Sequence, residues 1–152
     1  MAEQIESIKD DKMYAVGHLA LGYLTGKATS KLCRIDTNIP LLFILPVLPD
    51  IDLLIPGLSH RGPTHSIVVL SLLFIPLFLV YKKTVAPYFM ALLQHSLWDL
   101  IAGGGLQLLW PLTSETYGVK IQIQSLPNII MEWTSFLVFI TVALTTADLK
   151  KM

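Results

Sequence analysis

Four long apolar runs dominate the chain, and polar or helix-breaking residues separate them. They cover residues 39–56, 66–81, 84–101 and 126–147. A helix needs roughly 20 apolar residues to cross the hydrocarbon layer of a bilayer, with a range of about 17–25. The run 126–147 meets this length easily, whereas 66–81 is short and contains Pro76. The pattern predicts membrane-spanning helices, of which 66–81 needs flanking residues or a locally thinner bilayer to span.

A fifth segment, residues 13–30, is less apolar and rich in small residues. Gly22 and Gly26 lie about one helical turn apart in it, and this spacing lets helices approach closely in lipid. We interpret the segment as a packed membrane helix, with a helix lying in the membrane interface as the alternative. Residues 1–12 are charged and lack the apolar centre of a signal peptide. They predict a polar N-terminal tail, followed by a single membrane-embedded helical domain over residues 13–149.

Turn-forming residues lie between the five segments. Asn38 and Pro40 open the second, Pro56 and Gly57 close it, and Lys82 and Lys83 separate the third from the fourth; Gly103, Gly104 and Gly105 end the fourth. Short connections place successive helices side by side in opposite directions. The predicted fold class is therefore all-α, a multi-pass membrane helical bundle of about five helices.

Composition supports this class and excludes others. Hydrophobic residues make up 53% of the 152 residues and charged residues 14%, whereas soluble domains carry about 25% charged residues. Cys33 is the only cysteine, which excludes an intramolecular disulfide framework. The 11 basic and 11 acidic residues leave no basic face for a nucleic acid. We expect membrane lipids as partners and no nucleic acid.

Ionisable residues occur in or beside the apolar segments, where an ionised group is costly unless it is paired, bound to a metal or hydrated. In an alternating bundle all of them fall at the same end, which predicts one shared site. The set is His18, Asp50, Asp52, His60, His65, His95 and Asp99.

Individual motifs in this set allow two interpretations each. His95 and Asp99 share one helix face and could bind a metal together, or form a buried hydrogen bond. Asp50 and Asp52 could ligate one or two metals or act as a general base. Arg61, between His60 and His65, could bind a phosphate or carboxylate, or pair with Asp50 or Asp52. His18 could join the site or be a hydrogen-bonded packing residue.

The combination resembles the predicted membrane-bound metal-dependent hydrolases, an inner-membrane group that includes a LexA-regulated bacterial protein. The order of histidines and aspartates is also similar to zinc-dependent phospholipase C and P1-type nucleases. The resemblance implies that His18, Asp50, His65, His95 and Asp99 are metal ligands. It rests on Gly17-His18, Leu48-Pro49-Asp50-Ile51-Asp52, His60-Arg61-Gly62-Pro63-Thr64-His65-Ser66, His95-Ser96-Leu97-Trp98-Asp99 and Trp110-Pro111.

The sequence departs from the three-zinc phospholipases, which use further histidines after the His-x-x-x-Asp element. Here no histidine follows His95, and the later glutamates are Glu115 and Glu132. We therefore expect one or two divalent transition metals, with zinc preferred and manganese or iron as alternatives. The expected activity is hydrolysis of a phosphate- or ester-containing lipid or envelope substrate. Asp52 is the candidate general base or orienter of a histidine, and Arg61 and His60 are candidates for binding an anionic group. The alternative is a non-enzymatic membrane subunit, or a transporter of metal ions or protons.

Basic residues indicate an orientation, since positive charge marks the cytoplasmic side of membrane proteins. One side of the alternating bundle carries Lys27, Lys31, Arg34, Lys82, Lys83, Lys150 and Lys151. The opposite side carries Lys9, Lys12, Arg61 and Lys120. The predicted location is the cytoplasmic membrane, with the shared site facing away from the cytoplasm.

Overall fold

The computed structural model describes residues 14–102, 104–119 and 126–146. Within these ranges the regular elements are helices, so the predicted all-α class is confirmed for them; the predicted tail 1–12 lies outside the described residues. The α-helices are α2 (Tyr14–Cys33), α3 (Ile39–Ile44), α4 (Ile67–Tyr81), α5 (Ala86–Ala102) and α6 (Leu126–Thr145). The 3-10 helices are η2 (Leu45–Leu54), η3 (Pro63–His65) and η4 (Lys82–Val85).

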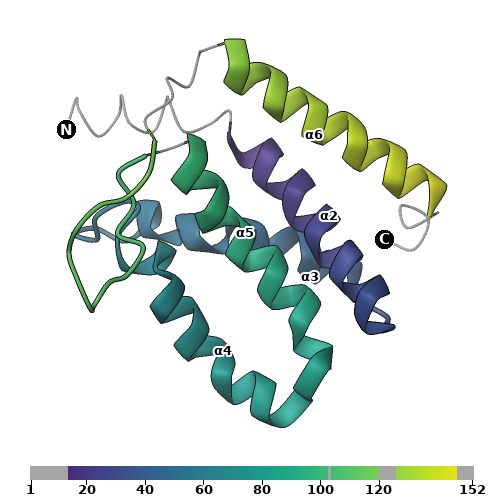
Figure 1. The fold of residues 1–152 in the computed structure, drawn as a ribbon, viewed down its shortest axis with the longest axis horizontal. Helices are drawn as coiled ribbons and strands as arrows, with labels where there is room; N and C mark the ends of the chain where they lie inside the picture. The colour runs from purple at the N-terminus through teal and green to yellow at the C-terminus, as the bar shows by residue number, and fades with distance from the viewer. Residues whose placement is uncertain (1–13, 103, 120–125, 147–152) are drawn as a thin grey trace.

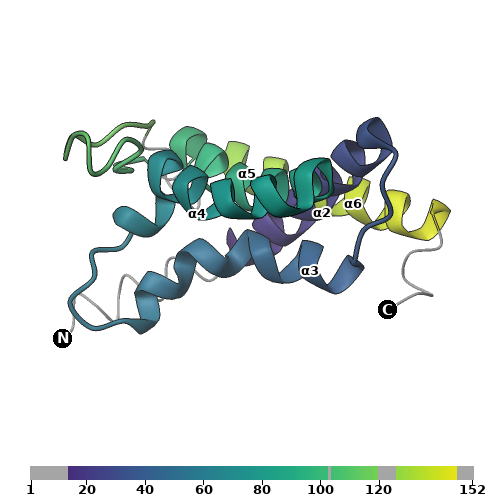
Figure 2. The same ribbon diagram turned by 90° about the horizontal axis from the view of Figure 1, so that it is seen from below.

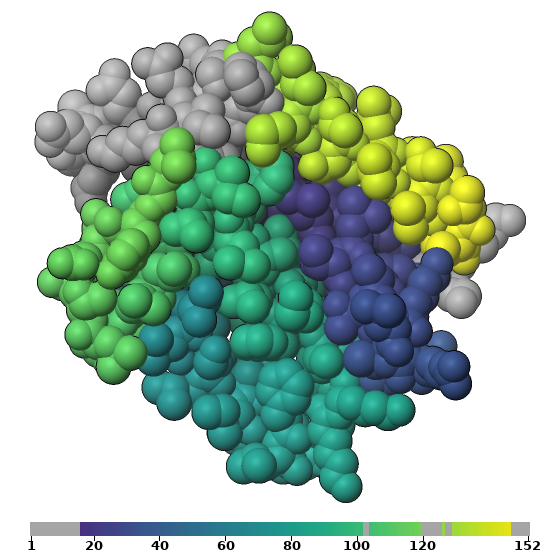
Figure 3. Space-filling model, in the orientation of Figure 1, coloured from purple at the N-terminus to yellow at the C-terminus, as the bar shows by residue number. Residues whose placement is uncertain are grey.

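The helices form two layers. Helices α4, α5, α2 and α6 lie side by side in that order (Figure 1). The α3–η2 segment crosses beneath them, and Figure 2 shows this segment running along the lower side of the layer. The space-filling view shows residues 104–119 against one end of this layer (Figure 3). Backbone hydrogen bonds fix that loop; among them, Ile67 donates to the Leu108 carbonyl and Gln107 donates to the Arg61 carbonyl, both at 3.0 Å.

The second predicted segment is not one continuous α-helix. Asn38 caps its start by accepting a hydrogen bond from the Leu41 amide, as the turn signal predicts. The α-helix then lasts only six residues before the chain tightens into η2. Pro46 and Pro49 explain this change, since a proline removes a backbone donor and its ring clashes with the preceding turn of an α-helix.

Helices α4 and α5 form a hairpin. One described stretch, residues 67–101, is apolar and long enough to cross a membrane by length and composition. It contains η4, where Lys82 adopts a positive φ of 51° and reverses the chain, as the lysine pair predicts. The stretch is therefore two antiparallel helices of 15 and 17 residues, about 22 and 25 Å long. Leu72, Leu79 and Val80 on α4 are more than half exposed, which is typical of a surface that contacts lipid or a partner.

Helix α2 is central and packs against α5, α6 and α3. Its two glycines allow the close approach. A Cβ on Gly22 would overlap the Pro46 ring, and a Cβ on Gly26 would lie 2.6 Å from Leu42 Cδ2. Tyr23, between them, is fully buried and stacks against Phe43. The interpretation of 13–30 as a packed helix therefore fits the structure of its described part.

Replacing Gly22 by alanine is expected to destabilise the protein. The added methyl group meets the Pro46 ring and lies 3.3 Å from the Ala91 carbonyl oxygen, and overpacking of this kind costs about 1–3 kcal/mol. Thermal unfolding of the purified protein in detergent measures the loss. Gly17→Ala is the matched control, because its Cβ would meet the flexible Glu132 side chain at 3.3 Å. Equal melting temperatures for the two variants would contradict the packing role of Gly22.

Candidate metal centre

The seven predicted histidines and aspartates, together with Arg61, converge at one end of the bundle. His18 comes from the first turns of α2, and His95 and Asp99 from the last turns of α5. The remaining residues come from η2 and from the connection into α4, which includes η3. These starts and ends lie at the same end of the layer because successive segments run in opposite directions (Figure 1). His18, Asp52, His65, His95 and Asp99 are all buried.

His95 is held in one tautomer by the backbone. Its Nδ1 lies 2.6 Å from the Pro46 carbonyl oxygen, and a carbonyl only accepts hydrogen bonds. Nδ1 therefore carries the hydrogen, and the Nε2 lone pair points to the other side. In a 3-10 helix the carbonyl of a residue accepts a hydrogen bond from the N–H three positions later, but the Pro46 carbonyl has no such donor. The residue three positions after Pro46 is Pro49, which has no N–H.

His65 is oriented in the same way by side chains. The Thr64 hydroxyl donates to Asp52 Oδ2 at 2.8 Å, so its single hydrogen is used there. Its oxygen lies 3.0 Å from His65 Nδ1 and accepts from it. The Nε2 lone pair of His65 then faces the Nε2 of His95 at 3.1 Å. Two lone pairs at this distance repel each other unless a proton or a metal cation lies between them.

Two carboxylate oxygens complete the set of facing acceptors. Asp50 Oδ1 lies 3.4 Å from His65 Nε2 and 3.2 Å from His95 Nε2. Asp99 Oδ2 lies 3.5 and 3.6 Å from the same two nitrogens. Ligands around a tetrahedral zinc, with bonds of about 2.0–2.2 Å, are separated by about 3.3–3.6 Å. Three of the four nitrogen–oxygen separations fall in this range, while the 3.2 Å from Asp50 to His95 and the 3.1 Å between the two nitrogens are slightly shorter.

The surroundings of His65 favour a positive charge. Burial alone lowers the pKa of His65, but the hydrogen bonds to Asp50 and Asp52 and the negative charge of Asp99 raise it to about 9. The same negative surroundings attract a divalent cation, which would displace the proton from Nε2.

Asp99 links the central atoms to His18 and Arg61. His18 Nε2 contacts Asp99 Oδ1 at 3.4 Å, and its ring stacks on His95 with 3.8 Å between centroids. Arg61 Nε contacts Asp99 Oδ2 at 3.4 Å. The sequence suggests Asp50 or Asp52 as an ion-pair partner for Arg61, whereas the observed partner of its side chain is Asp99. Arg61 instead holds a carboxylate of the cluster itself.

Asp52 lies behind the cluster as an acceptor of many hydrogen bonds. His60 Nδ1 donates to its Oδ1 at 3.0 Å, and the Arg61 amide donates to its Oδ2 at 3.1 Å. Thr64 supplies a third hydrogen bond, and His65 Nδ1 lies 3.3 Å away. With both oxygens occupied, Asp52 is suited to orienting His60 and His65 rather than to taking a proton from a substrate.

Several supporting groups are not apparent from the motifs. Thr64 and the Pro46 carbonyl set the two histidine tautomers, and Gln94 donates to the His18 carbonyl at 2.9 Å. Thr64 belongs to the His60–Ser66 motif, although its role there could not be read from the sequence. The three-residue spacing of Pro46 and Pro49 does indicate a free carbonyl, because Pro49 lacks the N–H that would bond it. Of the two later glutamates, Glu115 accepts from the Tyr117 hydroxyl, and Glu132 contacts Gly17 beside His18.

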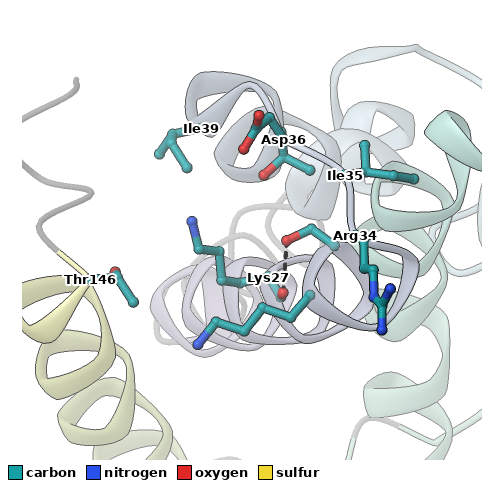
Figure 4. Close-up of a pocket in the computed structure, with 9 residues that line it drawn as sticks. Lys27, Arg34, Ile35, Asp36, Ile39 and Thr146 are labelled. Atoms are coloured by element: carbon teal, nitrogen blue, oxygen red, sulfur yellow. Dashed lines mark hydrogen bonds between the residues drawn. The ribbon is translucent and has the colours of Figure 1, made fainter.

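A cavity of about 590 Å³ lies near the opposite end of α2. Lys27, Lys31 and Arg34 line it together with Asp36, and Thr146 borders it beyond α6. In Figure 4 the Lys27 side chain extends toward Asp36 and Ile39. The bundle thus has an anionic cluster near one end and a group of cations near the other.

Comparison with known families decides what kind of protein this is. The family model described as YdjM inner membrane protein matches residues 13–151. The chain belongs to the YdjM inner membrane protein family. It is therefore an inner membrane protein in contact with lipid, and the YdjM match includes all eight residues of the cluster. Searches of curated proteins and of solved structures gave no match.

Proposed function

We propose that this YdjM-family protein is a zinc-dependent hydrolase. The observation that carries the proposal is that His65 Nε2 and His95 Nε2 lie 3.1 Å apart and that Asp50 Oδ1 and Asp99 Oδ2 each lie 3.2–3.6 Å from both nitrogens. These four residues are the proposed ligands. A mixed set of imidazoles and carboxylates is typical of zinc, and bound zinc lowers the pKa of a coordinated water to about 7.

One ion is favoured over two. The hydrogens on Nδ1 leave His65 and His95 only Nε2 for binding a metal, and both nitrogens point to the same place. A second group, formed by Asp52, His60 and His65, is already joined by hydrogen bonds. His18 reaches the other oxygen of Asp99, where it supports that ligand or occupies a further coordination position.

His60 is the proposed general base. Its Nδ1 donates to Asp52, so the Nε2 of the neutral ring carries the lone pair that can accept a proton. Its side chain is 23% exposed, and the Asp50 side chain is 29% exposed, whereas His65 and His95 are fully buried. The exposed edge of the cluster is thus where a substrate could reach the proposed base.

The location of the cluster supports a hydrolase over a transporter. Transport sites usually lie near the bilayer midplane on interrupted helices related by internal repeats. Asp50 and Asp52 do lie on an interrupted segment, α3–η2, but the acidic and imidazole groups are near one end of the bundle, at the first turns of α2 and the last turns of α5, rather than at its middle. A site at this depth can take a lipid headgroup or another envelope substrate from the membrane surface.

The proposed ligands predict the metal content. Purified protein should bind one equivalent of zinc, and His95→Ala and Asp50→Asn should each lower zinc affinity by about 10-fold or more, because each removes one ligand of a small set. Elemental analysis after dialysis against limiting zinc measures this. His60→Gln is the control, since His60 hydrogen-bonds Asp52 and meets the ligand His65 through an edge-to-face ring contact rather than through the proposed metal-binding nitrogen. Wild-type zinc content in both ligand variants would refute the assignment.

The proposed base predicts an activity difference at constant zinc content. His60→Gln should retain the metal but lower hydrolysis by about 10²-fold or more, since it removes proton transfer. Turnover of chromogenic phosphate esters and carboxyl esters by the zinc-loaded protein in detergent measures this. Equal turnover by the variant and the wild type would exclude His60 as the base.

We also infer a multi-pass topology with the cluster on the non-cytoplasmic side. Helices α2 and α6 have 20 residues each and are about 30 Å long, which equals the hydrocarbon thickness. The α3–η2 segment and the α4–α5 hairpin lie against them. Lys27, Lys31 and Arg34 gather away from the cluster, as the positive-inside rule requires for a cytoplasmic end.

Cysteine labelling tests this orientation. In a Cys33→Ser background, Ser59→Cys should react with a membrane-impermeant thiol reagent in spheroplasts, because exposed Ser59 lies beside His60. Thr84→Cys, exposed in η4 at the other end, should react only after lysis. The reverse pattern would place the cluster on the cytoplasmic side.

A further inference from the structure

An apolar groove of about 340 Å³ borders the cluster between η2 and α4. Its lining contains no charged residue, and its only side-chain hydroxyl, from Thr64, already donates to Asp52. The remaining lining residues are Leu48, Pro49, Ile51, Pro63, Val69, Leu70, Leu73, Phe74 and Leu92.

The groove and the cluster share the same backbone segments. Pro49 directly precedes Asp50, and Ile51 separates Asp50 from Asp52. On the other side, Thr64 lines the groove and bonds both Asp52 and His65. A molecule lying in the groove therefore has one end within a residue or two of the proposed zinc ligands.

The walls of the groove indicate what it holds. Leu48 and Ile51 are each 43% exposed, and Leu73 is 65% exposed, so the groove opens on an apolar surface. In an inner membrane protein such a surface faces lipid tails. A volume of about 340 Å³ lies near the lower end of the range for ligand pockets, about 300–1,000 Å³, which suits one chain rather than two.

We propose that the groove binds one hydrocarbon chain of a lipid whose polar group lies at the cluster. This inference rests on the proposed function and narrows its substrate class to lipids with an aliphatic chain near the bond to be cleaved. Asp50, His60 and Arg61 form the more exposed edge of the cluster, where the polar group would lie, while the chain extends between η2 and α4.

Photo-crosslinking with a single-chain phospholipid tests the groove. The probe is lysophosphatidic acid with a diazirine in its acyl chain, added to the zinc-loaded protein in detergent. Labels should map to residues 48–51 and 69–74, and excess unmodified probe should compete. Leu73→Trp fills the groove and should lower this labelling about tenfold, within the cost of overpacking a cavity. Leu72→Trp is the matched control, because neighbouring Leu72 is 57% exposed on α4 and does not line the groove.

The two proposals fail in different ways. Equal labelling of the Leu72→Trp and Leu73→Trp variants, with zinc still bound, would refute the groove and leave the metal site in place. Labelling spread evenly over α4 and α6 would refute it as well. Groove labelling in a protein that binds no zinc would support chain binding and refute the hydrolase. Unfolding temperatures of both tryptophan variants show whether a loss of labelling reflects misfolding.

Discussion

Two imidazole nitrogens that face each other at 3.1 Å, with carboxylate oxygens beside them, are the constraint on which this structure depends. No hydrogen bond between neutral rings can satisfy both, because His65 and His95 each carry their hydrogen on the other nitrogen. Burial makes the arrangement costly, since an unpaired acceptor away from water keeps its full desolvation penalty. A proton on His65 Nε2 or a metal cation between the two nitrogens removes that penalty, and the nearby Asp50 and Asp99 carboxylates stabilise either positive charge.

Keeping the cluster in place requires irregular backbone. The His95 tautomer depends on the Pro46 carbonyl, which is available because η2 is a 3-10 helix whose next donor position is Pro49. The same Pro46 ring packs against Gly22 of α2. Pro46 thus has two roles: its ring sets how closely α2 approaches η2, and its carbonyl orients His95. Packing in the middle of the bundle is thereby coupled to the geometry of the cluster near its end.

The sequence predicts the helices and the gathering of polar residues better than it predicts their contacts. Apolar runs and turn signals locate α2, α4, α5 and α6, and alternation of direction places His18, His65 and Asp99 at one end. The apolar length of residues 39–56 predicts one continuous helix. In the structure the prolines determine the local geometry.

Individual pairings could not be predicted because they depend on side-chain directions across different segments. Arg61 contacts Asp99, 38 positions away along the chain, rather than a neighbouring aspartate of η2. Its positive φ of 59° turns the backbone so that its own amide donates to Asp52 while its side chain reaches α5. Nothing in the local pattern of an arginine between two histidines indicates that conformation.

Uneven exposure of the cluster connects its structure to the proposed chemistry. Within the described residues, His18, His65, His95 and Asp99 are closed off by helices, whereas Asp50 and His60 reach the surface. Charges interact more strongly on the closed side, where the effective dielectric constant is low. Asp50 and His60 leave an open edge, next to the apolar groove, from which water and a polar headgroup can approach. A substrate with both a polar group and an aliphatic chain matches this boundary, whereas a wholly polar metabolite would leave the groove unused.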